Sequence, residues 1–279
     1  MSKCNKTGRF SFYVTLLTLI FLYAPLLVVA VASFNASKLG NQWQGFSLIW
    51  YEKLFQDAKI WEALCNTLII AIVATLISTV LGTLAALVLY RSKNKLKPIY
   101  TTLVYTPLVV PDILMGIGLL LLFVMFISLF GDVLTSLTGL DVGLGFTTIV
   151  IAHVTFCLSY VTMVVLGRLH EFDKSMLEAA QDLGASGLYT FLNVTLPAIL
   201  PGIIAGALFA FTLSIDDFVI TFFVKGAGDT TLPIFIESAM KKGRRLPLLN
   251  ALSVLFIVFT FIVVFVTQKI LTSQKDKNK

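Results

Sequence analysis

Long apolar segments separated by short polar ones make up most of this chain of 279 residues. A helix needs about 20 consecutive apolar residues to cross a bilayer. Six segments of that kind cover residues 10–34, 64–90, 101–130, 146–166, 198–224 and 248–271. Pro107 and Pro111 interrupt the third of them. The pattern predicts an all-α integral membrane protein in which residues 1–279 form a single transmembrane domain with six spans.

Composition supports this interpretation. Hydrophobic residues make up 57% of the chain, charged residues only 13%, and the mean hydropathy is +0.92, which is far from the usage of soluble domains. Runs of Leu, Ile and Val favour helical spans over barrel strands, in which apolar and polar residues alternate. The three cysteines, Cys4, Cys65 and Cys157, lie far apart in the sequence. This spacing favours neither a disulfide framework nor a zinc site.

The first apolar segment follows three basic residues, Lys3, Lys6 and Arg9, as a secretion signal also does. A signal core is about 7 to 15 residues long, and this segment is longer, so we expect it to be a membrane span. The small residues Ala30 and Ala32 resemble a cleavage site. Cleavage of the first span therefore remains an alternative.

Six spans place both termini on the same side of the membrane. With the termini in the cytoplasm, 13 of the 21 Lys and Arg residues are cytoplasmic and 8 are external, which agrees with the excess of positive charge in cytoplasmic loops. The short basic loop from Arg91 to Lys97 carries most weight. The basic cluster from Lys241 to Arg245 counts against this orientation. We expect residues 168–197 to form a cytoplasmic loop.

That loop contains a short amphipathic segment. Ser175 and Glu178 have the spacing of a capping box, and Gly184 is expected to end the helix that begins there. A helix of about two turns is too short to be stable alone. It therefore needs a surface on which to dock.

The chain has no G-x-x-x-x-G-K-[ST] sequence, so it has no P-loop for ATP. Any energy from ATP must arrive through another chain. We accordingly expect no cofactor in this chain and expect ATP to be bound by a partner subunit.

Three acidic residues within apolar segments are the candidate solute-binding residues. Asp216 and Asp217 are adjacent in the fifth segment, about 27 Å from its cytoplasmic end if the segment is one helix. An ionised side chain at that depth is costly and indicates a functional site. Neighbours on a helix point about 100° apart, so we expect one aspartate to bond to a neighbouring helix and the other to line the path.

Asp112 follows Pro111 and either caps a restarted helix or adds negative charge to the same cavity. His153 is expected to be a donor in helix packing, and Glu237 a solvated loop charge. A group of carboxylates with few opposing cations favours a positively charged solute. An ion-coupled carrier and a membrane scaffold protein are the alternatives, but the sequence shows no inverted repeat of the kind such carriers contain.

One motif resembles a known family. Glu178-Ala179-Ala180, three residues, Gly184, nine residues and Val194-Thr195-Leu196-Pro197 resemble the EAA loop of permease subunits of binding-protein-dependent ABC importers, with Val194 where the motif has Ile. In that family the loop is a cytoplasmic coupling helix that fits a groove on the ATPase subunit. The resemblance implies a type I ABC importer permease fold in the inner membrane, and assigns ATPase coupling to Glu178, Ala179, Ala180, Gly184, Leu196 and Pro197.

Further segments are similar to the polyamine (spermidine/putrescine) branch of that family, and most similar to its second putrescine permease subunit. They are Tyr23-Ala24-Pro25, Ser33-Phe34-Asn35, residues 107–112, 152–157 and 211–217, and Thr230-Thr231-Leu232-Pro233. The resemblance implies transport of polyamines, with putrescine as the first solute and spermidine as the second. It also implies a second permease subunit, two ATP-binding subunits and an extracytoplasmic polyamine-binding protein. Related permeases for iron or thiamine are the alternative.

Overall fold

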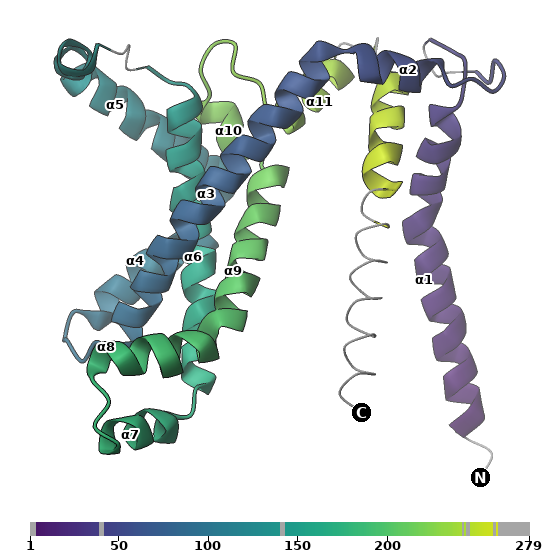
Figure 1. Ribbon diagram of the computed structural model, residues 1–279. Coiled ribbons are helices and arrows are strands. Elements are labelled where there is room, and N and C mark those ends of the chain that lie inside the picture. The colour runs from purple at the N-terminus through teal and green to yellow at the C-terminus, as the bar shows by residue number, and fades with distance from the viewer. Residues whose placement is uncertain are drawn as a thin grey trace. The chain divides into compact units, whose positions relative to one another are not determined.

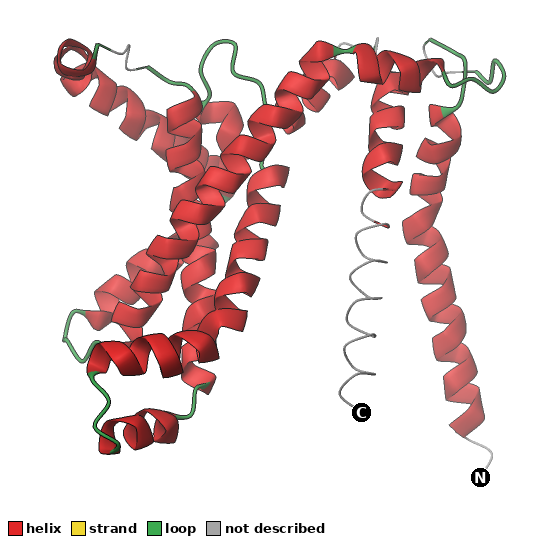
Figure 2. Ribbon diagram, viewed as in Figure 1, coloured by secondary structure: helices red, strands yellow, loops and turns green. Residues whose placement is uncertain are grey.

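The computed structural model describes residues 4–38, 42–139, 143–241, 243, 246–258 and 261. All regular structure in this part of the chain is helical, and one isolated β-bridge joins Asn35 to Phe46 (Figure 2). The chain divides into two compact units, residues 1–61 with 236–279, and residues 62–235. The helices are α1 (Cys4–Ser33), α2 (Ile49–Gln56), α3 (Ala58–Arg91), α4 (Lys97–Val109), α5 (Asp112–Thr138), α6 (Phe146–Glu171), α7 (Lys174–Asp182), α8 (Gly187–Thr190), the π-helix η1 (Phe191–Thr195), α9 (Leu196–Asp216), α10 (Val219–Val224) and α11 (Leu232–Lys241).

Five stretches of helix are long and apolar enough to cross a membrane, which confirms the predicted all-α membrane fold. They are Phe10–Ser33, Ala58–Arg91, Asp112–Leu137, Phe146–Glu171 and Gly187–Asp216. A shorter apolar helix, Leu246–Val258, covers the first half of the sixth predicted segment. Residues 259–260 and 262–271 of that segment lie outside the described residues.

Two of the predicted spans are broken. The third divides into α4 and α5, because Val110 and Pro111 are extended, with ψ of 129° and 138°; proline cannot donate a backbone hydrogen bond and disfavours a helical residue before it. In the fifth, α9 ends at Asp216 and α10 begins at Val219. The prediction of a continuous fifth span over 198–224 was therefore wrong.

In the unit formed by residues 1–61 and 236–279, the segment after α1 is fixed by buried polar contacts. The Asn35 side chain donates to the Gln42 carbonyl and accepts from the Gln44 amide, at 2.8 and 2.9 Å. The Trp50 indole donates to the Asn35 carbonyl at 2.8 Å. Part of the region between the first two spans is thus a folded helix, α2, held against the end of α1.

The structure also corrects the expectation for Glu237. This residue lies in helix α11 and forms an ion pair with Lys241 one turn later. It is therefore a helical, partly buried charge and not a solvated loop charge. Of the basic cluster from Lys241 to Arg245, residues 242, 244 and 245 lie outside the described residues.

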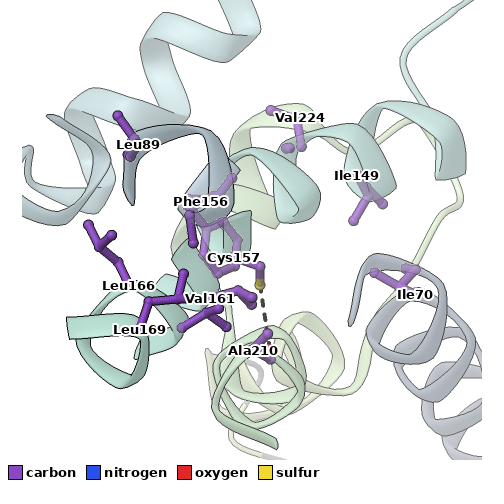
Figure 3. Close-up of a cluster of buried hydrophobic side chains, with 14 of the residues drawn as sticks. Ile70, Leu89, Ile149, Phe156, Cys157, Val161, Leu166, Leu169, Ala210 and Val224 are labelled. Atoms are coloured by element: carbon purple, nitrogen blue, oxygen red, sulfur yellow. Dashed lines mark hydrogen bonds between the residues drawn. The ribbon is translucent and has the colours of Figure 1, made fainter. Parts of the chain in front are cut away.

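In the unit formed by residues 62–235, α6 packs antiparallel to α9 through two rows of residues spaced by four. The α6 row is His153, Cys157, Val161 and Val165, and the α9 row is Gly202, Gly206, Ala210 and Ser214; all eight are buried. A Cβ at Gly206 would lie 3.4 Å from Val161, and the Cys157 thiol donates to the Ala210 carbonyl at 3.4 Å (Figure 3). Small residues allow this close approach. The register brings His153 against Ser214, just before the break at the end of α9.

The two ends of α9 carry different features. Its N-terminal end joins α7, α8 and η1, and its C-terminal end joins α10 (Figure 1). With 21 residues, α9 is about 31 Å long. The predicted coupling segment and the predicted acidic residues therefore lie at opposite ends of one helix.

Candidate functional site

A cavity of about 260 Å³ lies where the α4–α5 break meets the α9–α10 break. Pro107 and Asp112 contribute to it from the first break, and Asp216, Asp217 and Phe218 from the second. All three acidic residues predicted from the sequence thus line one cavity. Its volume is below the roughly 300–1,000 Å³ of pockets for drug-sized ligands, so it suits a small solute.

Asp217 is engaged by its surroundings. Its Oδ2 atom accepts from the Thr221 amide at 2.8 Å and from the Thr221 hydroxyl at 2.7 Å, and its Oδ1 atom accepts from the Ile220 amide at 3.2 Å. His153 Nε2 lies 3.3 Å from Oδ2. These contacts satisfy free amides in the first turn of α10. They explain why the helix breaks here although no proline or glycine is present.

Asp216 and Asp112 differ from Asp217 in their contacts. Both carboxylates are exposed at the cavity, and neither has a hydrogen-bond or ion-pair partner among the described residues. Asp112 is the first residue of α5 but makes no capping hydrogen bond there, so the capping alternative was wrong and its charge faces the cavity. Asp217 lies after the end of α9, so the two aspartates are not neighbours on one helix. Its contacts with Thr221 of α10 and His153 of α6 nevertheless agree with the expectation that one of the two bonds to a neighbouring helix, and both residues line the cavity.

The helix ends around the cavity add to this charge distribution. The C-terminus of α9 at Asp216 has carbonyls without helical partners and a partial negative charge. The N-terminus of α5 at Asp112 has the opposite partial charge. Three carboxylates line the cavity, two of them without a partner among the described residues, and they outweigh the one positive helix end, so the cavity is attractive to a small cation.

Aromatic side chains complete the cavity wall. Phe156 and Tyr160 lie one turn apart on α6, and Phe218 lies in the break between α9 and α10. Aromatic faces attract organic cations when they are desolvated. The sequence analysis missed these three residues. Their signal is spacing: Phe156 and Tyr160 follow His153 at three and seven residues, on adjacent turns of one helix.

The predicted coupling segment forms helix α7, but it begins one residue earlier than expected. The helix runs from Lys174 to Asp182, and the Asp173 carboxylate accepts from the Ser175 amide at 2.9 Å. This backbone hydrogen bond, helped by one from the Ser175 hydroxyl, lowers the pKa of Asp173 below its usual value. Ser175 lies inside the helix, so the predicted capping box of Ser175 and Glu178 was wrong, and Asp173 is the cap.

Gly184 ends α7 in the predicted way. Its φ of +80° is in the left-handed region that favours glycine. The Ala185 amide donates to the Ala180 carbonyl at 3.0 Å, which is the long hydrogen bond of a Schellman cap. Glu178 and Ala179 are exposed, and Leu183 is 89% exposed. An apolar and acidic surface of this chain is therefore open to a partner at α7.

Leu196 and Pro197 lie where the loop enters α9, and they explain the π-helix that precedes them. Pro197 has no amide hydrogen to give to the Asn193 carbonyl four residues earlier. The Leu196 amide donates five residues back, to Phe191, in the π pattern. A π-turn inside a longer helix frequently marks a functional position. The last two residues of the motif thus fix how the loop joins α9.

Comparison with known proteins identifies similar chains. Residues 78–274 match the family described as "Binding-protein-dependent transport system inner membrane component". The chain is 43% identical over 258 residues to the putrescine transport system permease protein PotI of Escherichia coli, covering 91% of this chain and 87% of that protein. It is 37% identical over 250 residues to the spermidine/putrescine transport system permease protein PotC of Haemophilus influenzae, covering 90% of this chain and 91% of that one.

Solved structures show the same fold. A chain of a bacterial ABC transporter that imports the acidic polysaccharide alginate has a TM-score of 0.72 at 18% identity, with 95% of this chain and 96% of that chain covered. A second structure, of a bacterial alginate ABC transporter in complex with an alginate pentasaccharide-bound periplasmic protein, has a TM-score of 0.69 at 21% identity, covering 94% of each chain. At these identities the likeness concerns the fold alone.

Proposed function

The chain belongs to the family of inner membrane components of binding-protein-dependent transport systems, the permease subunits of ABC importers, and we propose that its solute is a polyamine, with putrescine first. It is a multi-pass membrane protein and a transport subunit, not an enzyme. The polyamine assignment has two supports: the cavity at the helix breaks and the names of the similar permeases.

The unpaired carboxylates of Asp112 and Asp216 are the observation that carries the proposal. Each carboxylate needs a cation or water, because an ionised group at this depth is costly without a partner. Putrescine has an ammonium group at each end of an apolar chain. Two acids with aromatic neighbours Phe156 and Tyr160 match that chemistry. The permeases PotI and PotC carry putrescine and spermidine/putrescine in their names.

The proposed assembly follows the family pattern. A second permease subunit completes the pore, two ATP-binding subunits lie in the cytoplasm, and a polyamine-binding protein delivers the solute from outside. ATP is bound by those partners, so no cofactor is assigned to this chain. The complex of an alginate transporter with its periplasmic protein supports the delivery step. The exposed acidic and apolar surface of α7 supports an ATPase contact.

In the proposed mechanism, ATP binding by the partner subunits moves α7, and α9 transmits the movement to the cavity about 31 Å away. Alternating access then exposes Asp112 and Asp216 first outward and then inward. A ligand or partner shifts such an equilibrium only if it binds the two states differently. We therefore place the differential contact of the ATPase at Glu178 and its neighbours.

The orientation is tested by a reporter fused after Gly187, between α7 and α9. We expect it to behave as cytoplasmic, because the basic loop from Arg91 to Lys97 favours the inside. A second measurement places a single introduced cysteine at the same position and records whether a membrane-impermeant reagent labels it from outside. Labelling from outside in intact cells would contradict the coupling role of the loop and the cytoplasmic placement of both termini.

The solute is tested by competition. In vesicles that contain the complete transporter, uptake of labelled putrescine is expected to require ATP and to fall with unlabelled putrescine or spermidine. Fe(III) is expected to leave it unchanged, because the described residues hold no cluster of metal ligands. Thiamine is expected to leave it unchanged because its single positive charge cannot pair with both unpaired carboxylates of the cavity. Inhibition by thiamine or Fe(III) alone would assign the chain to a related importer, and ATP-independent uptake would indicate an ion-coupled carrier.

A further inference from the structure

His153 occupies a buried position behind the cavity and connects three helices. It lies on α6 and is 1% exposed. Nδ1 lies 2.7 Å from the hydroxyl of Ser214 on α9, and Nε2 lies 2.9 Å from the hydroxyl of Thr221 on α10. Ser214 is 2% exposed and Thr221 is fully buried. Both ring nitrogens are therefore used, one on each side of the α9–α10 break.

The directions of these hydrogen bonds follow from Asp217. An ionised carboxylate only accepts, so the Thr221 hydroxyl donates to Asp217 at 2.7 Å. The Thr221 oxygen then accepts from Nε2–H of His153, and in the neutral ring Nδ1 accepts from the Ser214 hydroxyl. In a helix a serine hydroxyl often donates to the carbonyl four residues earlier, which for Ser214 is the carbonyl of Ala210. The Cys157 thiol donates to that carbonyl (Figure 3), and the Ser214 hydroxyl donates to His153.

This network fixes the conformation of the break. Asp217 accepts from the first turn of α10, and His153 holds both Thr221 and the last turn of α9. Asp216 lies between these anchored positions and exposes its carboxylate at the cavity. A shift of the break would redirect Asp216, which has no partner of its own among the described residues.

We propose that His153 is a positioning residue for transport: through Ser214, Thr221 and Asp217 it holds the α9–α10 break so that Asp216, and not Asp217, meets the solute cation. The proposal rests on the proposed function. It leaves two free carboxylates in the cavity, Asp112 and Asp216, against the two ammonium groups of a diamine. A displaced Asp216 removes one of the two charge contacts that putrescine can make in the cavity. Spermidine is longer and has a third ammonium group, so it can still reach a displaced Asp216 while another of its ammonium groups stays at Asp112.

The test uses the complete transporter reconstituted with its binding protein, and measures the maximal rates of ATP-dependent uptake of putrescine and spermidine separately. His153→Ala is expected to lower the putrescine rate about tenfold, the effect of one lost hydrogen bond to a charged group. The spermidine rate falls less, so the spermidine-to-putrescine ratio rises. His153→Gln keeps an amide donor of similar reach and is expected to recover most of the rate and the normal ratio.

Thr162→Ala is the matched control, because Thr162 is fully buried on α6 and its hydroxyl donates within that helix, to the Leu158 carbonyl, and not to the network. It should leave the ratio unchanged. A second arm combines His153→Ala with Asp217→Asn. If the two substitutions act through one contact, the uptake rate of the double variant is within about threefold of the rate of the worse single variant. If they act independently, the two reductions in rate multiply.

Two outcomes would overturn the inference. One is a wild-type ratio and rate in His153→Ala; the other is an equal loss for both solutes that follows the amount of transporter in the membrane, which would make His153 a packing residue only. A wild-type transporter that carries neither polyamine would instead overturn the proposed function, whatever the variants do.

Discussion

Asp216→Asn is expected to lower the maximal rate of ATP-dependent putrescine uptake by about 10- to 100-fold. A hydrogen bond to a charged group contributes about 1.5–3 kcal/mol, and each 1.4 kcal/mol is a factor of ten. The substitution keeps the shape of the side chain and removes its charge. Asp216 accepts no hydrogen bond from the described residues, so its loss leaves no donor of this chain unsatisfied, and the amount of folded protein should not change.

Asp132→Asn is the control for this prediction. Asp132 is an exposed acid on α5 that does not line the cavity, so the variant makes the same change in net charge without touching the site. Uptake should remain at the wild-type rate. If Asp216→Asn retained full uptake while the protein reached the membrane in normal amount, the cavity would not be the solute path.

Glu178→Lys is expected to lower uptake by more than about tenfold, because opposed like charges across an interface cost several kcal/mol. Glu178 is exposed in the middle of α7. Its replacement leaves the Asp173 cap and the Gly184 turn intact, so the helix itself should persist. The loss is expected in the ATPase activity stimulated by the loaded binding protein as well as in uptake, since the contact couples the two.

Asp182→Lys provides the matched comparison. It makes the same charge reversal on the same helix, at an exposed position that the E-A-A-x3-G spacing leaves free. A basic residue at the C-terminal end of a helix also interacts favourably with the helix dipole. We expect near-normal uptake from this variant. Equal defects in both variants would indicate a general charge effect and not a specific role for Glu178.

The lengths of the apolar runs were sufficient to predict the main features of the fold. Runs longer than 20 residues gave the membrane helices, because a helix in lipid must be apolar along its whole length. The glycine at 184 gave the end of α7, since its left-handed conformation excludes most other residues. The acids were found for the same reason, as Asp112, Asp216 and Asp217 interrupt otherwise apolar segments.

The local details of the site were not accessible from the sequence in the same way. The break after Asp216 has no proline or glycine. It depends on a local contact of Asp217 with Thr221, four residues later, and on a tertiary contact with His153, 64 residues earlier in sequence. The cap of α7 was wrongly assigned to Ser175. A capping box would pair the Ser175 amide with Glu178, but the carboxylate of Asp173, two residues earlier, accepts from that amide instead. The row Gly202, Gly206, Ala210 and Ser214 was a visible signal for the α6–α9 contact.

The most direct measurement is a structure of the complete transporter with putrescine trapped by blocking ATP hydrolysis. We predict density for the diamine at the helix breaks, with its nitrogen atoms about 3 Å from the carboxylates of Asp112 and Asp216, and with Asp217 still bound to Thr221. Density for the solute away from these two acids, or an ammonium group held by Asp217 after its release from Thr221, would contradict the account.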